Sequence, residues 1–81
     1  MAAPEPREVA RVLSGHLEAL YEFYGSETGV RVARKHLAWY CRGRVGADYF
    51  WQRVREVDCA RQQKLLTQHY FDSLSSLAIA A

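Results

Sequence analysis

The fold of this chain is decided by the segment YGSETGVRVARKHLAWY at residues 24–40, where one predicted helix ends and a second begins. Gly25 stands where a helix should stop, because glycine readily adopts the positive φ of a helix C-terminus. Upstream of it, the sequence predicts a helix from about Glu5 to Tyr24. Its apolar side chains recur at spacings of three and four residues, which places them on one helix face. They are Val9, Val12, Leu13, Leu17, Leu20, Tyr21 and Tyr24.

Downstream of Gly25 the segment predicts a second helix. It should begin between Ser26 and Val30 and end near Gly43. Ser26 and Thr28 both qualify as its N-cap, and the sequence does not choose between them. Gly43 and Gly46 then bracket a short turn.

Two further helices are predicted after that turn. The third runs from about Ala47 to Val57, and Asp58 can cap the fourth. Short connections favour antiparallel neighbours. We therefore expect an all-α fold, a small compact four-helix bundle that forms a single domain over residues 1–81. The apolar set of the fourth helix is Leu65, Leu66, Tyr70, Leu74 and Leu77.

The composition is that of an ordinary globular chain, with 49% hydrophobic and 25% charged residues. Cys41 and Cys59 are too few for a disulfide scaffold and lack the paired short spacings of zinc ligands, so we expect free thiols and no metal. The N-terminus lacks a basic segment followed by an apolar run, and no apolar stretch is long enough to cross a bilayer. The expected location is therefore cytoplasmic, without membrane contact.

Positive charge is concentrated in the middle of the chain. The formal net charge is only +2, but residues 31–55 carry +6, against −3 for residues 1–30 and −1 for residues 56–81. Local concentration of charge matters more than the total for attracting an anionic partner. In the second predicted helix, steps of 100° per residue place four basic side chains within one arc of about 100°. They are Arg31, Arg34, Lys35 and Arg42.

This basic arc has two interpretations. Like charges at such spacings repel, so a chain with a thin core tolerates them more easily when an anion compensates them. Phosphate is the natural candidate, because guanidinium groups match its oxygens bidentately. The alternative is a solvated basic face that Glu18 or Glu22 of the first helix partly neutralises.

The same segment resembles a known family. The order of Tyr24 and Gly25, a glycine-valine-arginine turn, the arginine-lysine-histidine stretch at residues 34–36 and the Trp39-Tyr40 pair are similar to the C-terminal domain of bacterial tRNA-dihydrouridine synthases, closest to the B-type enzymes. The resemblance covers about residues 12–75. It implies a small helical domain that holds the tRNA body by its backbone, attached to a flavin-bearing TIM barrel that reduces a uridine of tRNA with NADPH.

The resemblance also suggests roles for individual residues. Arg31, Arg34 and Lys35 would face tRNA phosphates, and His36, Trp39 and Tyr40 would shape the helix or its contacts. Arg42 and Arg44 extend the basic surface, a prediction that rests on charge geometry more than on the motif. The predicted nucleic-acid-binding residues are thus Arg31, Arg34, Lys35, His36, Arg42 and Arg44.

The sequence departs from the family pattern at several positions. Ala38 stands where glycine is usual and Ser26 where an acid is frequent. Trp51 and Arg55 stand about where an arginine and an asparagine are typical, so the family's contacts are not carried over to the third helix.

The barrel is absent, and with it the FMN site, the approach of NADPH and the catalytic cysteine, whose position neither Cys41 nor Cys59 matches. This chain alone is therefore expected to carry no cofactor and no catalytic residue. Its expected partners are tRNA and the barrel domain.

Two other functions stay open. The second and third helices with their short turn are compatible with a helix-turn-helix DNA binder, although Asp48, Tyr49 and Phe50 are poor base-reading residues. The second open function is that of a protein-docking domain left from a truncated synthase.

The aromatic residues leave further questions open. Burial is the default for Phe50 and Trp51, whereas exposure of Trp51 would favour docking. Tyr40 is expected in the core. Trp39 is undecided between packing and base stacking, and His36 between phosphate contact and a packed ring hydrogen-bonded to a carbonyl.

Overall fold

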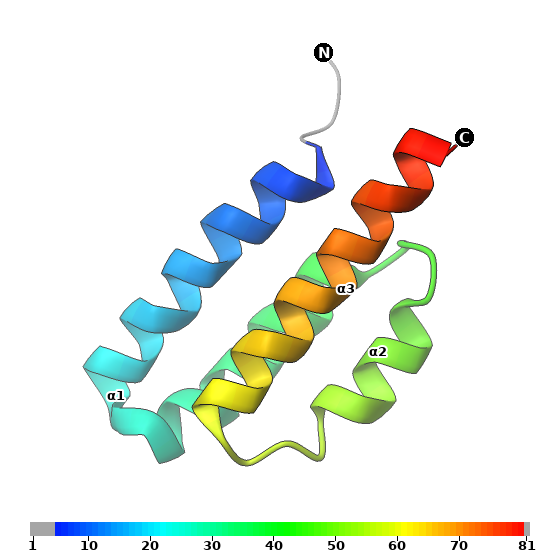
Figure 1. Cartoon of the computed structure of the whole chain (residues 1–81). Coiled ribbons are helices and arrows are strands. Elements are labelled where there is room, and N and C mark those ends of the chain that lie inside the picture. Colours follow the sequence, from blue (N-terminus) through cyan, green and yellow to red (C-terminus); the bar gives the residue numbers. More distant parts are fainter. Residues whose placement is uncertain (1–4, 81) are drawn as a thin grey trace.

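The protein is described by a computed structural model that covers residues 5–80, with side chains described for residues 5–76. It contains three α-helices: α1 (Pro6–Cys41), α2 (Ala47–Val54) and α3 (Ala60–Ala80) (Figure 1). No strand occurs among the described residues, so the predicted all-α class is confirmed. None of these helices is both long and apolar enough to cross a membrane.

Helix α1 is broken at Gly25. This residue has φ 83° and ψ 163°, a backbone conformation that side-chain-bearing residues rarely adopt. The chain therefore reverses over a single residue, and helical structure continues on both sides of it (Figure 1). We call residues 6–24 the first arm of α1 and residues 26–41 its second arm.

The prediction of a four-helix bundle was wrong, because residues 5–80 form three helices. The first two predicted helices are the two arms of α1, since the bend at Gly25 is too tight to leave a loop between them. The later boundaries also shift. Helix α2 ends at Val54 instead of Val57, and α3 begins at Ala60, after the predicted cap Asp58.

The core collects side chains from both arms of α1, from α2 and from α3. The expected apolar face of the first arm is largely present, but Val12 is 58% and Tyr24 45% exposed. Leu65 of α3, also predicted apolar, is 48% exposed, and Leu77 lies outside the residues whose side chains are described. The central buried side chains are Leu13, Leu17, Ala33, Leu37, Cys41, Phe50, Val54 and Phe71.

The two arms of α1 touch backbone to backbone at Gly29. A Cβ atom at this position would lie 2.9 Å from the carbonyl oxygen of Leu20 and 3.0 Å from the Cα atom of Tyr21. Only glycine leaves room for so close an approach.

A buried polar side chain joins both arms to α3. Gln63 is fully buried, accepts a 2.6 Å hydrogen bond from the Tyr21 hydroxyl and donates a 3.1 Å bond to the carbonyl of Val30. Burial raises the pKa of the Tyr21 hydroxyl to about 12, and the nearby Cys59 thiol acts in the same direction. Both functional ends of the Gln63 amide are thereby satisfied, which a buried amide requires to avoid a desolvation cost.

Candidate nucleic-acid interface

The second arm of α1 and its C-cap residue present three cations to solvent along one line. Arg31, Lys35 and Arg42 are all exposed. Their spacing of four and seven residues keeps them on one face of a helix. From first to last, the line extends about 16 Å along the helix axis, at a rise of about 1.5 Å per residue. We call these three residues the basic strip.

The basic strip has no acidic partner within the described part of the chain. The three ion pairs found there join Arg11 to Glu8, Arg34 to Asp58 and Lys64 to Glu18. Glu18, one of the two acids considered as a neutralising partner, is therefore engaged by α3 instead. The positive charge of the strip is available to an external anion.

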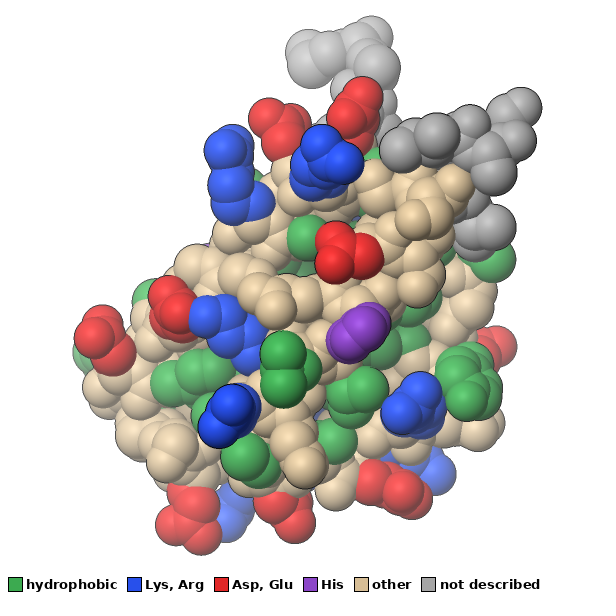
Figure 2. Space-filling model, in the orientation of Figure 1, with side chains coloured by type: hydrophobic (Ala, Val, Ile, Leu, Met, Phe, Trp, Pro, Cys, Tyr) green, Lys and Arg blue, Asp and Glu red, His purple; other side chains and the backbone are tan. Residues whose placement is uncertain are grey.

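The face formed by the first arm, α3 and α2 has a different character. Figure 2 shows the face formed by the first arm, α3 and α2, with the second arm behind them. Basic and acidic side chains are interspersed over this face, without a continuous area of one sign. A polyanion would meet alternating attraction and repulsion here.

Arg34 is separated from the other predicted cations by its contacts. Its Nη2 atom donates hydrogen bonds to the carbonyl of Val57, at 3.0 Å, and to a carboxylate oxygen of Asp58, at 3.1 Å. The side chain is only 26% exposed, and its Nε atom is buried without a partner. Arg34 thus links the second arm to the connection between α2 and α3. Of the four residues in the predicted basic arc, Arg34 has a structural role, and the other three are exposed to solvent.

Arg44 is also engaged within the molecule. Its Nε atom donates a 2.9 Å hydrogen bond to the carbonyl of Tyr40, and its guanidinium lies 5.4 Å from the ring centre of Phe71. These two contacts hold Arg44 between the C-terminal end of α1 and the buried Phe71. Arg44 remains a predicted site residue whose guanidinium is already partly occupied.

His36 is half-buried and packs against the first arm. Its ring lies 5.4 Å from that of His16, edge to face at 62°. This favours the packed-ring interpretation, with an imidazole as the neighbour where a carbonyl was expected.

The aromatic predictions divide between core and surface. Phe50 is buried and Tyr40 half-buried against the core, as expected. Trp51 is half-buried and packs against the same core, so it does not form an exposed docking patch. Trp39, by contrast, is 76% exposed, with the Arg42 guanidinium 5.9 Å from its ring centre.

Sequence reasoning left Trp39 undecided between core packing and base stacking. A signal was present, because it follows Lys35 by four residues and precedes Arg42 by three, which places it among the strip residues.

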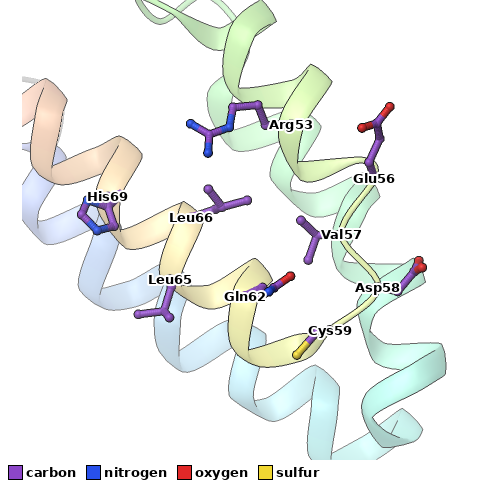
Figure 3. Close-up of a pocket in the computed structure, with 9 residues that line it drawn as sticks. All are labelled: Arg53, Glu56, Val57, Asp58, Cys59, Gln62, Leu65, Leu66 and His69. Atoms are coloured by element: carbon purple, nitrogen blue, oxygen red, sulfur yellow. The ribbon is translucent and has the colours of Figure 1, made fainter.

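A groove of about 700 Å³ lies between α2 and α3 (Figure 3). Cys59 and His69 stand at opposite ends of it, and ten residues of helix separate positions by about 15 Å. They therefore form no thiol–imidazole pair for nucleophilic chemistry. Glu56 and Asp58 add negative charge to the rim beside Arg53.

Both cysteines are free thiols, as predicted. Cys59 is exposed and Cys41 buried, and burial raises the pKa of the Cys41 thiol to about 12, partly opposed by the charge of Arg44. Among the described residues, no group of three or more His, Cys, Asp or Glu side chains could hold a metal ion.

Comparison with known proteins gives a consistent result. The dihydrouridine synthase (Dus) family model matches residues 1–75. The chain is 46% identical over 66 residues to a tRNA-dihydrouridine synthase B of Xanthomonas campestris pv. campestris. The aligned residues cover 82% of this chain and 20% of that protein. It is 39% identical over 69 residues to tRNA-dihydrouridine synthase B of Vibrio vulnificus, with 85% and 21% covered.

A third relative is tRNA-dihydrouridine synthase B of Pseudomonas putida, 39% identical over 71 residues, with 88% of this chain and 21% of that protein covered. The chain thus spans about a fifth of the length of the curated relatives it matches. No solved structure matches it.

Proposed function

The chain belongs to the dihydrouridine synthase family, and we propose that it acts as the C-terminal, tRNA-binding helical domain of a B-type enzyme of that family. The observation that carries this proposal is the basic strip. Arg31, Lys35 and Arg42 are exposed on one helix face and make no ion pair among the described residues. Three unpaired cations on a rigid element suit the phosphate backbone of a folded RNA.

The proposed mode of binding is recognition of backbone and shape. The guanidinium groups of Arg31 and Arg42 can each hold a phosphate bidentately, and Lys35 acts as a point charge between them. Arg34 supports this arrangement because it bonds the second arm to the connection between α2 and α3, and Arg44 caps the end of that arm at Tyr40 and packs on Phe71 of α3. Such contacts position the RNA without reading its sequence.

Catalysis is assigned to another part of the protein. The relatives are about five times as long as this chain, and we propose that a barrel domain supplies the FMN site and the approach of NADPH. The α2–α3 groove is a poor match for FMN, since Arg53 is the one cation among the residues that line it and Glu56 lies on the same rim, whereas a flavin phosphate favours several cations. The partners of this chain are then tRNA and the barrel, and a role on tRNA implies a cytoplasmic location.

The structure gives little support to the DNA-binding alternative. Phe50, in the first turn of α2, is buried, and Asp48 before it is an exposed acid. A recognition helix needs polar or basic side chains at these positions to contact base edges.

The test is binding of tRNA across a salt series, with duplex DNA of equal charge as the competitor. Three phosphate contacts predict that log affinity falls with log salt with a slope of about −2 to −3. Replacing Arg31, Lys35 and Arg42 together by glutamine should weaken tRNA binding and bring this slope close to zero.

A matched control removes the same charge from another surface. Arg53, Arg55 and Arg61 are exposed on or beside α2 and α3, so their triple glutamine variant should lose much less affinity. Equal losses in the two triple variants would show that net charge alone attracts the RNA. Absence of salt-sensitive binding by the unmodified chain would leave the protein-docking function instead.

A further inference from the structure

The basic strip contains an aromatic side chain that phosphate binding does not explain. Trp39 lies between Lys35 and Arg42 in sequence and on the same helix face. Its indole is 76% exposed. A single exposed apolar residue is ordinary on a protein surface, so its surroundings must decide whether it has a role.

Those surroundings are cationic and hollowed. The Arg42 guanidinium lies 5.9 Å from the centre of the indole ring. Trp39 also lines two open recesses, one of about 320 Å³ with Lys35 and His36 and one of about 240 Å³ with His36 and Tyr40. A flat ring could therefore lie against the indole while cations remain within reach of the phosphates attached to it.

The backbone that carries the indole is fixed by its neighbours. Tyr40, the next residue, packs against the core, and its carbonyl accepts the hydrogen bond from Arg44. The amide of Arg42 in turn bonds to the carbonyl of Trp39 at 3.4 Å. A stacking surface that is ordered before binding loses less entropy when a ligand arrives.

We infer that Trp39 is a base-stacking site for an unpaired nucleotide of the bound RNA, an assignment that rests on the function proposed above. An exposed indole offers a π-face that stacks on any base, and adjacent cations hold the flanking phosphates. Bases inside a duplex already stack on their neighbours. The ligand must therefore be a nucleotide of a loop, a bulge or a single-stranded end.

The experiment compares Trp39→Leu and Trp39→Phe with the unmodified chain. Each is titrated with total tRNA and with an RNA duplex of equal charge that has no unpaired nucleotide. Trp39→Leu should weaken tRNA binding by between about five- and a hundredfold, as expected for loss of one base–aromatic stack. Trp39→Phe should keep most of the affinity, and duplex binding should be unchanged in both variants.

A matched control is Tyr49→Leu. Tyr49 is 68% exposed on α2 and has the Arg53 guanidinium 5.7 Å from its ring centre, so it reproduces the aromatic–cation pair away from the basic strip. Its replacement should leave tRNA affinity unchanged. Because Trp39 and Tyr49 are both exposed, urea unfolding should confirm that all three variants are as stable as the unmodified chain.

A second measurement follows the indole directly. In a Trp51→Phe chain, whose folding is checked first, Trp39 is the only tryptophan. Stacking should quench its fluorescence with tRNA and leave it unchanged with the duplex.

Three outcomes overturn the inference. If Trp39→Leu binds tRNA as tightly as the unmodified chain, the base-stacking role is wrong, while the RNA-binding function stands. Equal losses on tRNA and duplex also exclude stacking on an unpaired base. If the unmodified chain binds neither RNA, the proposed function itself fails, and this site fails with it.

Discussion

Gly29 provides the sharpest test of the fold, because it sits where the two arms of α1 meet. In Gly29→Ala, the new methyl group would lie 2.9 Å from the Leu20 carbonyl oxygen and 3.0 Å from the Tyr21 Cα atom. Both neighbours belong to the backbone, so neither can rotate away. The arms must separate by a few tenths of an ångström, and the 2.6 Å bond between Tyr21 and Gln63 must loosen with them.

The size of the effect follows from three terms. Overpacking against a rigid neighbour costs about 1–3 kcal/mol. Weakening a buried hydrogen bond adds about 1 kcal/mol, and alanine in place of glycine inside a helix returns about 1 kcal/mol. Gly29→Ala should therefore destabilise the protein by roughly 1–3 kcal/mol, which lowers Tm by about 5–20 °C in a domain of this size.

Gly15 is the matched control on the first arm. A Cβ atom there meets nothing within 4 Å, and the residue is helical and exposed. Gly15→Ala should therefore stabilise the protein by about 0.5–1 kcal/mol. Urea unfolding followed by far-ultraviolet circular dichroism measures both variants. If Gly29→Ala stabilises the protein as Gly15→Ala does, the arms do not touch and the proposed packing of α1 is refuted.

Three further predictions concern single groups. In the folded protein, the exposed Cys59 should react rapidly with a thiol reagent, whereas the buried Cys41 should react only as fast as the protein opens. Equal reaction rates of the two thiols would contradict this. Ionisation of Tyr21 should lower the free energy of unfolding between about pH 10 and about pH 12, since its pKa is raised to about 12 from its ordinary 10 and only the unfolded phenol ionises early; the buried Cys41 thiol adds a decline that begins near pH 9. Tyr21→Phe should make this decline shallower, and an unchanged slope would remove Tyr21 as its source. Gln63→Leu should cost about 1–3 kcal/mol, measured by urea unfolding, because it leaves the Tyr21 hydroxyl and the Val30 carbonyl without their partner; an unaltered midpoint would show that this bridge contributes nothing.

Several features of this protein follow from local sequence. Spacings of three and four predicted the helices, and Gly25 and Gly43 marked where they stop, because φ preference is a property of one residue. The motif at residues 24–40 suggested the family that the comparisons then showed. These inferences needed no knowledge of which segments meet.

Only the tertiary structure decided how the chain reverses at Gly25. The sequence correctly predicted a stop there, but whether a loop or a single residue joins the two helices depends on how closely their backbones approach. That distance is set at Gly29, against Leu20 and Tyr21.

The tertiary structure also decided which basic residues are available. Helical periodicity fixed the angles of Arg31, Arg34, Lys35 and Arg42 around one axis, and by angle alone all four belong together. The partner of Arg34 lies on the connection between α2 and α3, more than twenty residues away in the chain, so no local pattern shows that its guanidinium is engaged. A helix determines the direction in which each side chain points, but the placement of the neighbouring helices determines what it meets there.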